Sequence, residues 1–188
     1  HKQINDLISS GSSSISEEIW EISDLAIYVN TLKRSSVKGL ENKLRHLISD
    51  DFAQYRSARY EIQVAGILLG KGHCVEFIEE GNAKTPDILI INGNDRCEIE
   101  CKHKEPGEDQ LDYIKSIYNN TQRARKQFSK TCAGAIFIEV DKRKYDDFLQ
   151  ERERLASEMG RAIRGSSSIS AICLTSKIAF EDENDFVY

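Results

Sequence analysis

The sequence predicts an α/β protein with a mixed central β-sheet flanked by helices, and with extra helices at its N-terminus. Before residue 70, apolar residues recur three and four positions apart in three successive segments, which is the period of amphipathic helices. From residue 73 onward, short β-branched segments are separated by turn-like sequences, and the later ones alternate with helical segments. Because helices that alternate with strands return the chain to the same sheet, we expect a core order of helix, three strands, helix and strand, αβββαβ.

The composition is that of an ordinary globular protein. The chain has 188 residues, of which 39% are hydrophobic and 30% are charged, so one principal domain can bury its own core without disulfides. No apolar run approaches the roughly 18 residues of a membrane span, and no signal peptide opens the chain, so we expect a cytoplasmic protein without a membrane partner. The first residue is His1 and not Met, which is compatible with an excised part of a larger parent chain.

The N-terminal third is expected to be helical after a short lead-in. The serine-rich stretch that ends at Ser16 has the composition of a flexible linker. A helix follows, with Ser14 and Glu17 as its capping pair, and a second runs from about Val37 to Ile48. These helices are expected to pack on the domain or to form a homodimer. The predicted division is a lead-in over 1–16, a helical segment over 17–50 and the main domain over 51–188.

The third helix places an acid among apolar residues. It is expected to start at Asp50 or Asp51 and to end at Gly70 or Gly72. On it, Glu61 belongs to a row of otherwise apolar side chains, so its carboxylate points away from solvent and needs a partner.

The second and third predicted strands bring charged residues together. The segments that begin at Pro86 and Arg96 are joined by the turn-like "NGND", so they should be antiparallel neighbours. Alternation along the latter puts Glu100 and Lys102 on a polar face, with the core on the other face. Asp87, near the start of one strand, should therefore lie beside Glu100 and Lys102, in a polar site outside the packed interior.

The next helix, expected within 108–130, is basic, although the chain as a whole is acidic. The chain carries a net charge of −5, yet no acid occurs between Tyr113 and Ile138. Phosphate contact or an ordinary solvated face would each explain such a helix, and we expect phosphate contact. The five basic residues of this segment are Lys115, Arg123, Arg125, Lys126 and Lys130. A buried strand within 134–140, a charged helix over about 144–163 and a strand over 169–175 complete the predicted order.

Pro86 and Asp87, followed after twelve residues by Glu100, Cys101 and Lys102, resemble the motif of the PD-(D/E)xK nuclease superfamily. The order of elements between Asp51 and Val140 is similar to the core of that restriction-endonuclease-like fold. Glu61 fits the acid that many members carry on the first core helix. The resemblance covers about half of the chain.

The resemblance implies a metal-dependent endonuclease. In such an enzyme Asp87 and Glu100 would bind Mg²⁺, or Mn²⁺ as a substitute, with the Cys101 carbonyl as a third ligand and Glu61 binding directly or through water. Lys102 would orient the attacking water or help to deprotonate it. Many relatives carry a glutamine on the following helix near the active centre; Gln122 is the expected residue here, and Lys126 is the alternative.

Three functions remain open from the sequence. The leading hypothesis is cleavage of DNA. An RNA-cleaving toxin domain of a longer chain, and a nuclease-fold module that binds nucleic acid without cleaving it, are the alternatives. The five cysteines contain no CxxC pair, and the four histidines are scattered, so neither a zinc ribbon nor a disulfide framework is indicated.

Overall fold

A computed structural model describes residues 17–79, 85–103, 113–140, 149–166, 168–176, 180–181 and 186–187. The predicted lead-in, with Ser14 of the capping pair, lies outside these residues. Five helices are present in the described part: α2 (Glu17–Arg34), α3 (Leu40–Leu47), α4 (Phe52–Gly70), α5 (Tyr113–Ala124) and α7 (Arg152–Ile163). The strands are β1 (Cys74–Phe77), β2 (Ile88–Asn92), β3 (Asp95–Lys102), β4 (Ala133–Glu139), β5 (Ile169–Thr175), β6 (Phe180–Glu181) and β7 (Phe186–Val187).

The main sheet has five strands in the order β1-β2-β3-β4-β5, and it is mixed as predicted. The first three strands form antiparallel pairs, with the tight turn between β2 and β3 placing Ile88 opposite Ile99. The last three strands are parallel, because α5 and α7 carry the chain back between them. The order αβββαβ is therefore present from α4 to β4. β6 and β7 form a separate two-stranded pair.

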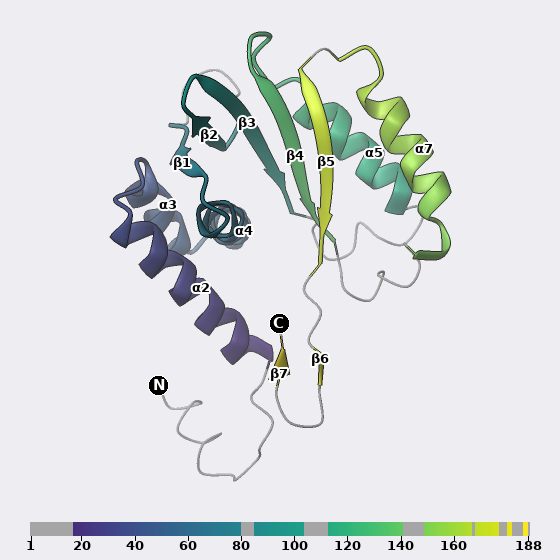
Figure 1. Ribbon diagram of the computed structural model, residues 1–188. Coiled ribbons are helices and arrows are strands. Elements are labelled where there is room, and N and C mark those ends of the chain that lie inside the picture. Colours follow the sequence, from purple (N-terminus) through teal and green to yellow (C-terminus); the bar gives the residue numbers. More distant parts are fainter. Residues whose placement is uncertain are drawn as a thin grey trace.

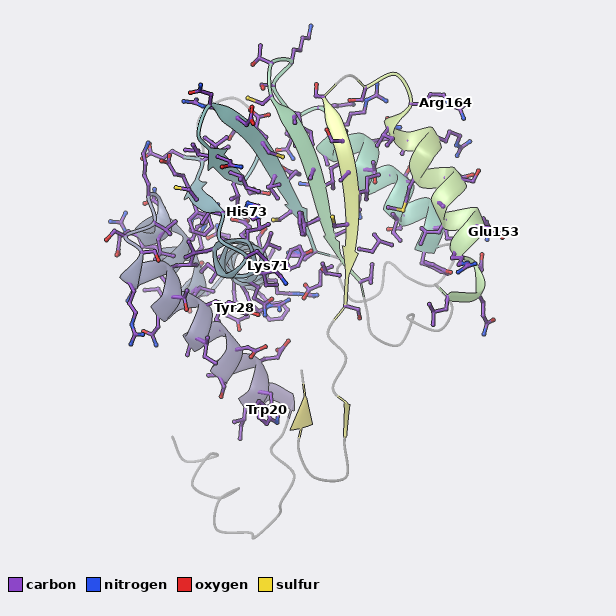
Figure 2. All side chains as sticks on the ribbon, viewed as in Figure 1. Trp20, Tyr28, Lys71, His73, Glu153 and Arg164 are labelled. Atoms are coloured by element: carbon purple, nitrogen blue, oxygen red, sulfur yellow. The ribbon has the colours of Figure 1, made fainter. Side chains whose placement is uncertain are left out.

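Helices cover both faces of the sheet (Figure 1). α2, α3 and α4 lie on one side, where the core includes Ile62 of α4 and Ile99 of β3. α5 and α7 lie on the other side, where the core includes Ile117 of α5 and Ile136 of β4. Figure 2 shows side chains filling the space between the sheet and each helical layer. The sheet therefore has no solvated face in its centre, and polar residues there must be buried.

α3 is attached to the sheet by the loop that precedes it. The amide of Phe77 in β1 donates a 2.9 Å hydrogen bond to the carbonyl of Lys38. Gly39 follows with a φ of 79°, and a Cβ at this position would lie 2.7 Å from the carbonyl oxygen of Phe77. Only glycine combines this left-handed backbone with so close an approach. The loop thus holds the start of α3 against β1, next to the candidate site.

The helix boundaries agree with the prediction at α4 and at the end of α7, and they differ at α3 and α5; the predicted start of the last helix, near residue 144, lies outside the described residues. Asp51 is the N-cap of α4, and its side chain accepts a 2.9 Å hydrogen bond from the amide of Ala53. α3 begins at Leu40 and not near Val37, because the chain first passes through the glycine turn. α5 ends at Ala124, before the predicted end, because a turn follows over 125–127. No helix of the described residues is long and apolar enough to cross a membrane.

Candidate active site

Asp87 is held in place by the backbone of the strand beside it. It lies just before β2, and its own amide donates a 2.9 Å hydrogen bond to the carbonyl of Ile99. Its carboxylate atom Oδ2 accepts a 2.7 Å hydrogen bond from the amide of Cys101. The expected convergence of the two strand ends is confirmed by these contacts. Because both bonds are made to backbone, the position of this carboxylate depends on the strand pairing itself.

Glu100 is the most deeply buried acid of the site. Its side chain is 1% exposed, and its Oε1 atom contacts both the ammonium group of Lys102 and the side-chain amide of Gln127. The other oxygen, Oε2, is buried without a hydrogen-bond partner among the described residues. Lys102 is partly exposed, as expected for a polar site, whereas Glu100 on the same polar face of β3 is closed off from solvent. β3 pairs in register with β4, so Glu100 shares its face with Ile136, under α5, and that face is covered.

Lys102 connects this buried acid with solvent. Its side chain is 28% exposed, whereas the glutamate that it contacts is closed off. One end of the ion pair is therefore accessible to a substrate while the other is shielded from water. A lysine in this position can hold a negatively charged group that approaches from outside.

Burial and the neighbouring carboxylates change the pKa values of the acids in the site. Burial, and then the charges of Glu61 and Glu100, raise the pKa of Asp87 well above its usual range. Burial likewise raises the pKa of Glu100, although the nearby ammonium of Lys102 opposes the shift. Both shifts have the cause expected for acids that are gathered in a poorly solvated place. A cation bound between them would favour their charged forms.

Glu61 is buried as predicted, and its partner is a lysine that no sequence pattern singled out. Lys43 of α3 places its Nζ atom 2.7 Å from Oε2 of Glu61, a distance typical of an ion pair. The two side chains are 4% and 6% exposed. The spacing of Leu40 and Leu44 indicated a helix here, but nothing in the sequence pairs it with α4.

α4 is fixed to the sheet by a second polar network. The guanidinium of Arg59 donates two hydrogen bonds, of 2.7 and 2.6 Å, to the carboxylate of Glu139 at the end of β4. Tyr60 places its hydroxyl 2.7 Å from that of Thr175 at the end of β5. Arg59 and Tyr60 directly precede Glu61, so these contacts hold the helix turn that carries it. No sequence pattern predicted this network, because its partners lie 80 and 115 residues apart.

The glutamine at the site is Gln127 and not Gln122. The side-chain amide of Gln122 donates a 2.8 Å hydrogen bond to the carbonyl of Ala162 in α7. Gln127 lies beyond the end of α5, and the turn over 125–127 directs its amide to Glu100. The range expected for this helix, up to residue 130, includes Gln127, but α5 ends at Ala124. Its signal in the sequence was weak, because a glutamine beyond a helix end has no periodic position.

Two other residues of β3 have structural roles. Glu98 accepts a 2.7 Å hydrogen bond from the amide of Ser129 and so anchors the loop after α5. The thiol of Cys101 is buried, and burial followed by the charges of the neighbouring acids raises its pKa well above the usual range. It is therefore a neutral core thiol, while its amide holds Asp87.

The predicted basic residues are divided between surface and interior contacts. Arg125 donates a 3.2 Å hydrogen bond to the carbonyl of Ala162, so it contributes to the packing of α5 on α7. α7 adds cations to the same layer, and Arg161 stacks 4.5 Å from the ring centre of Tyr118. Figure 2 shows Arg164 at the end of α7. Four of the five basic residues of the predicted set are exposed: Lys115, Arg123, Lys126 and Lys130.

The side chains of the site fit a hard divalent cation, such as Mg²⁺, that takes only a few of its ligands from the protein. Among the described residues there is no group of three or more His, Cys, Asp or Glu side chains arranged to enclose a metal. Mg²⁺ commonly takes only one or two carboxylates, together with water and substrate phosphate. Asp87 and Glu100 offer two such groups, and their carboxyl groups are close enough to hydrogen-bond to each other. Two neighbouring carboxylates match that requirement.

Comparison of the chain with family models, with curated proteins and with solved structures returned no match.

Proposed function

We propose that this protein is a metal-dependent endonuclease that hydrolyses phosphodiester bonds in DNA. One observation carries the proposal: Asp87, fixed by the Cys101 amide, lies in the field of Glu100, and Glu100 is paired with the partly exposed Lys102. Two acids and a lysine at the end of a β-hairpin are the groups that the PD-(D/E)xK resemblance assigns to the reaction.

Asp87 and Glu100 would hold Mg²⁺, with the Cys101 carbonyl as a further donor. When bound, the ion would neutralise charge on the phosphate and lower the pKa of water. The chain supports this role by keeping the two carboxylates close despite their repulsion. Hydrogen bonds to backbone and to Gln127 offset part of that cost.

Lys102 has the position required to act on the attacking water. Its ammonium group is anchored on Glu100 and is partly open to solvent, so it can orient water and stabilise charge next to the phosphate. Gln127 holds the same oxygen of Glu100 and so fixes the carboxylate from the side of the α5–β4 loop. We assign it a positioning role.

The exposed cations of α5 and of the loop after it supply a binding surface. Lys126 and Lys130 flank Gln127 in sequence, so phosphates bound by them would lie near the acids. Such contacts are independent of base sequence, which fits backbone binding and not base recognition.

The test is incubation of the purified protein with plasmid, single-stranded DNA and transfer RNA, each with Mg²⁺ and with EDTA. Cleavage of plasmid that requires Mg²⁺ and is lost in Lys102→Ala would support the proposal. Cleavage of the RNA alone would assign the protein to the RNA-cleaving class. Binding to any of the three without cleavage would identify a nuclease-fold binding module.

A further inference from the structure

The candidate site contains two lysines, and only one of them lies on the strand that carries the motif. Lys43 comes from α3, outside the αβββαβ core, and reaches Glu61 at 2.7 Å. Both partners are almost fully buried, so water screens their interaction poorly. α3 therefore contributes a fixed positive charge to the acids of the centre.

We infer that Lys43 is the permanent counter-ion of Glu61, that it keeps this carboxylate from binding metal, and that the centre consequently takes one divalent cation. The inference rests on the proposed function, since it assumes that Asp87 and Glu100 bind the ion. It assigns Lys43 a positioning role and departs from the expectation that Glu61 binds metal.

The charges of the site favour a single ion. Three carboxylates, Asp87, Glu61 and Glu100, face two ammonium groups, Lys43 and Lys102. When a bound cation keeps Asp87 and Glu100 in their charged forms, these five groups carry a net charge of −1, so one divalent ion brings the site to +1 and a second would bring it to +3. A second ion on Glu61 would also stand next to the ammonium that already lies 2.7 Å from the carboxylate. Like charges at such a separation repel strongly away from water.

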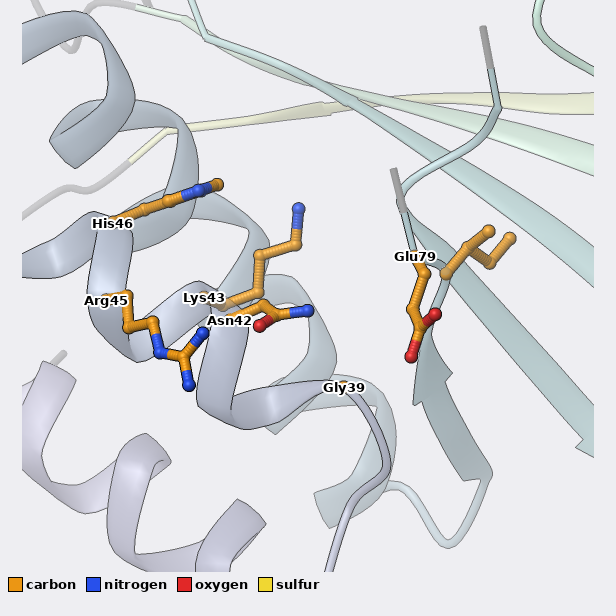
Figure 3. A pocket seen from close by; sticks show the side chains of 7 residues that line it. Gly39, Asn42, Lys43, Arg45, His46 and Glu79 are labelled. Atoms are coloured by element: carbon orange, nitrogen blue, oxygen red, sulfur yellow. The ribbon is translucent and has the colours of Figure 1, made fainter. Parts of the chain in front are cut away.

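An open pocket lies beside the buried ion pair. Lys43 lines a pocket of about 260 Å³ between α3 and the end of β1. Figure 3 shows Asn42 and Lys43 on the α3 side of this pocket, with Glu79 on the opposite side. The ammonium of Lys43 lies 2.7 Å from the carboxylate of Glu61. The Lys38–Phe77 hydrogen bond and Gly39 hold the start of α3 close enough for this contact.

The experiment is titration calorimetry with Mn²⁺ on the wild-type protein and on the double variant Lys43→Met/Glu61→Gln. The double variant removes both charges, so it leaves no buried ion without a partner and should remain folded. We expect one Mn²⁺ per chain in both proteins, with affinities within about threefold, because neither residue is a ligand. In Lys43→Met alone, Glu61 becomes available, so a second Mn²⁺ should bind and the rise in melting temperature with Mn²⁺ should exceed that of the wild type.

Lys38→Met is the matched control. Lys38 forms an ion pair with Glu76 at 3.7 Å near the same end of the sheet, but its side chain is 71% exposed. Removing this solvated charge should change neither the number of bound ions nor the affinity.

Two bound ions in the wild type, or loss of Mn²⁺ binding in the double variant, would overturn the inference while leaving the nuclease proposal intact. A single ion in Lys43→Met, with an unchanged melting response, would also overturn it. Absence of Mn²⁺ binding from the wild type, with and without DNA, would overturn the proposed metal chemistry and this inference together.

Discussion

The amide of Cys101 donates a 2.7 Å hydrogen bond to the carboxylate of Asp87, across the antiparallel pair of β2 and β3. An amide that binds a carboxylate makes a charge-assisted hydrogen bond, which is stronger than a neutral one. The bond therefore fixes Asp87 next to Glu100 although the charge of that residue raises the pKa of Asp87. The pairing of β2 and β3 therefore keeps the two carboxyl groups close together, although they repel each other.

Asp87→Asn should abolish metal binding and cleavage together. The amide that replaces the carboxylate can still accept the hydrogen bond from Cys101, but it no longer supplies charge for a cation. In EDTA the variant should be more stable than the wild type by about 1 kcal/mol, because a repulsive charge has gone. Calorimetric titration and thermal unfolding in EDTA measure the two effects. A variant that binds Mg²⁺ as the wild type does would contradict the role of Asp87.

Lys102→Ala should retain metal and nucleic acid but lose cleavage. It removes no ligand, so the rate should fall by several orders of magnitude at unchanged Mg²⁺ affinity. Since Glu100 is buried, removal of its ion-pair partner should also cost about 1–3 kcal/mol of stability in the absence of metal. Single-turnover cleavage and urea unfolding give both values. Wild-type rates in this variant would remove the main support for a nuclease.

Stability of the metal-free protein should fall as the pH rises above about 4, where Asp and Glu side chains of the unfolded chain ionise. Burial and neighbouring charge raise the pKa values of Asp87 and Glu100, so the native state retains protons that the unfolded chain has released. For each acid, a tenfold difference between the folded and unfolded ionisation constants corresponds to about 1.4 kcal/mol. This free energy of unfolding is lost as the pH rises from the unfolded pKa to the folded pKa. Calorimetry in EDTA at several pH values tests this.

The Asp87→Asn variant is the control for the pH series. The difference in stability between the variant and the wild type should be small near pH 4 and should grow as the pH rises, because only the wild type acquires the additional charge. Parallel curves for the two proteins would show that Asp87 does not titrate in this range.

Gln127→Ala and Gln122→Ala form a matched pair on either side of the end of α5. The first variant frees Glu100 from its amide donor, so cleavage should fall about 10- to 100-fold with nucleic-acid binding unchanged. The second removes a hydrogen bond to Ala162, so it should cost about 1 kcal/mol of stability and leave the rate at the wild-type level. If cleavage falls in Gln122→Ala and not in Gln127→Ala, Gln122 would be the glutamine that positions the site.

Alanine at Arg123, Lys126 and Lys130 should weaken DNA binding about equally for all sequences. Each lost phosphate contact should reduce the slope of log affinity against log salt by about one unit. Metal affinity should hardly change, since none of the three contacts Asp87 or Glu100 in the described structure. Arg125 is not included because it bonds to α7. An unchanged salt slope would identify these residues as an ordinary solvated face.

The sequence by itself determined the local parts of the site. Alternation along β3 and the short turn before it predicted that Asp87, Glu100 and Lys102 converge, because a tight hairpin leaves little choice of register. Helical spacing predicted the burial of Glu61, and side-chain chemistry predicted an N-cap at Asp50 or Asp51, of which Asp51 is the cap. Each of these predictions depends on residues that are close in the chain.

Only the tertiary structure decided which groups neutralise the acids. Lys43 reaches Glu61 because a glycine turn holds α3 against β1, and Gln127 reaches Glu100 because α5 ends three residues before it. Both pairings join separate elements, so no periodicity reports them. Burial of Glu100 likewise followed from the packing of α5 and α7 over a face that alternation alone marked as polar. Sequence patterns specify which face of a helix or strand is polar and which is apolar, and the packing of other elements decides what covers each face.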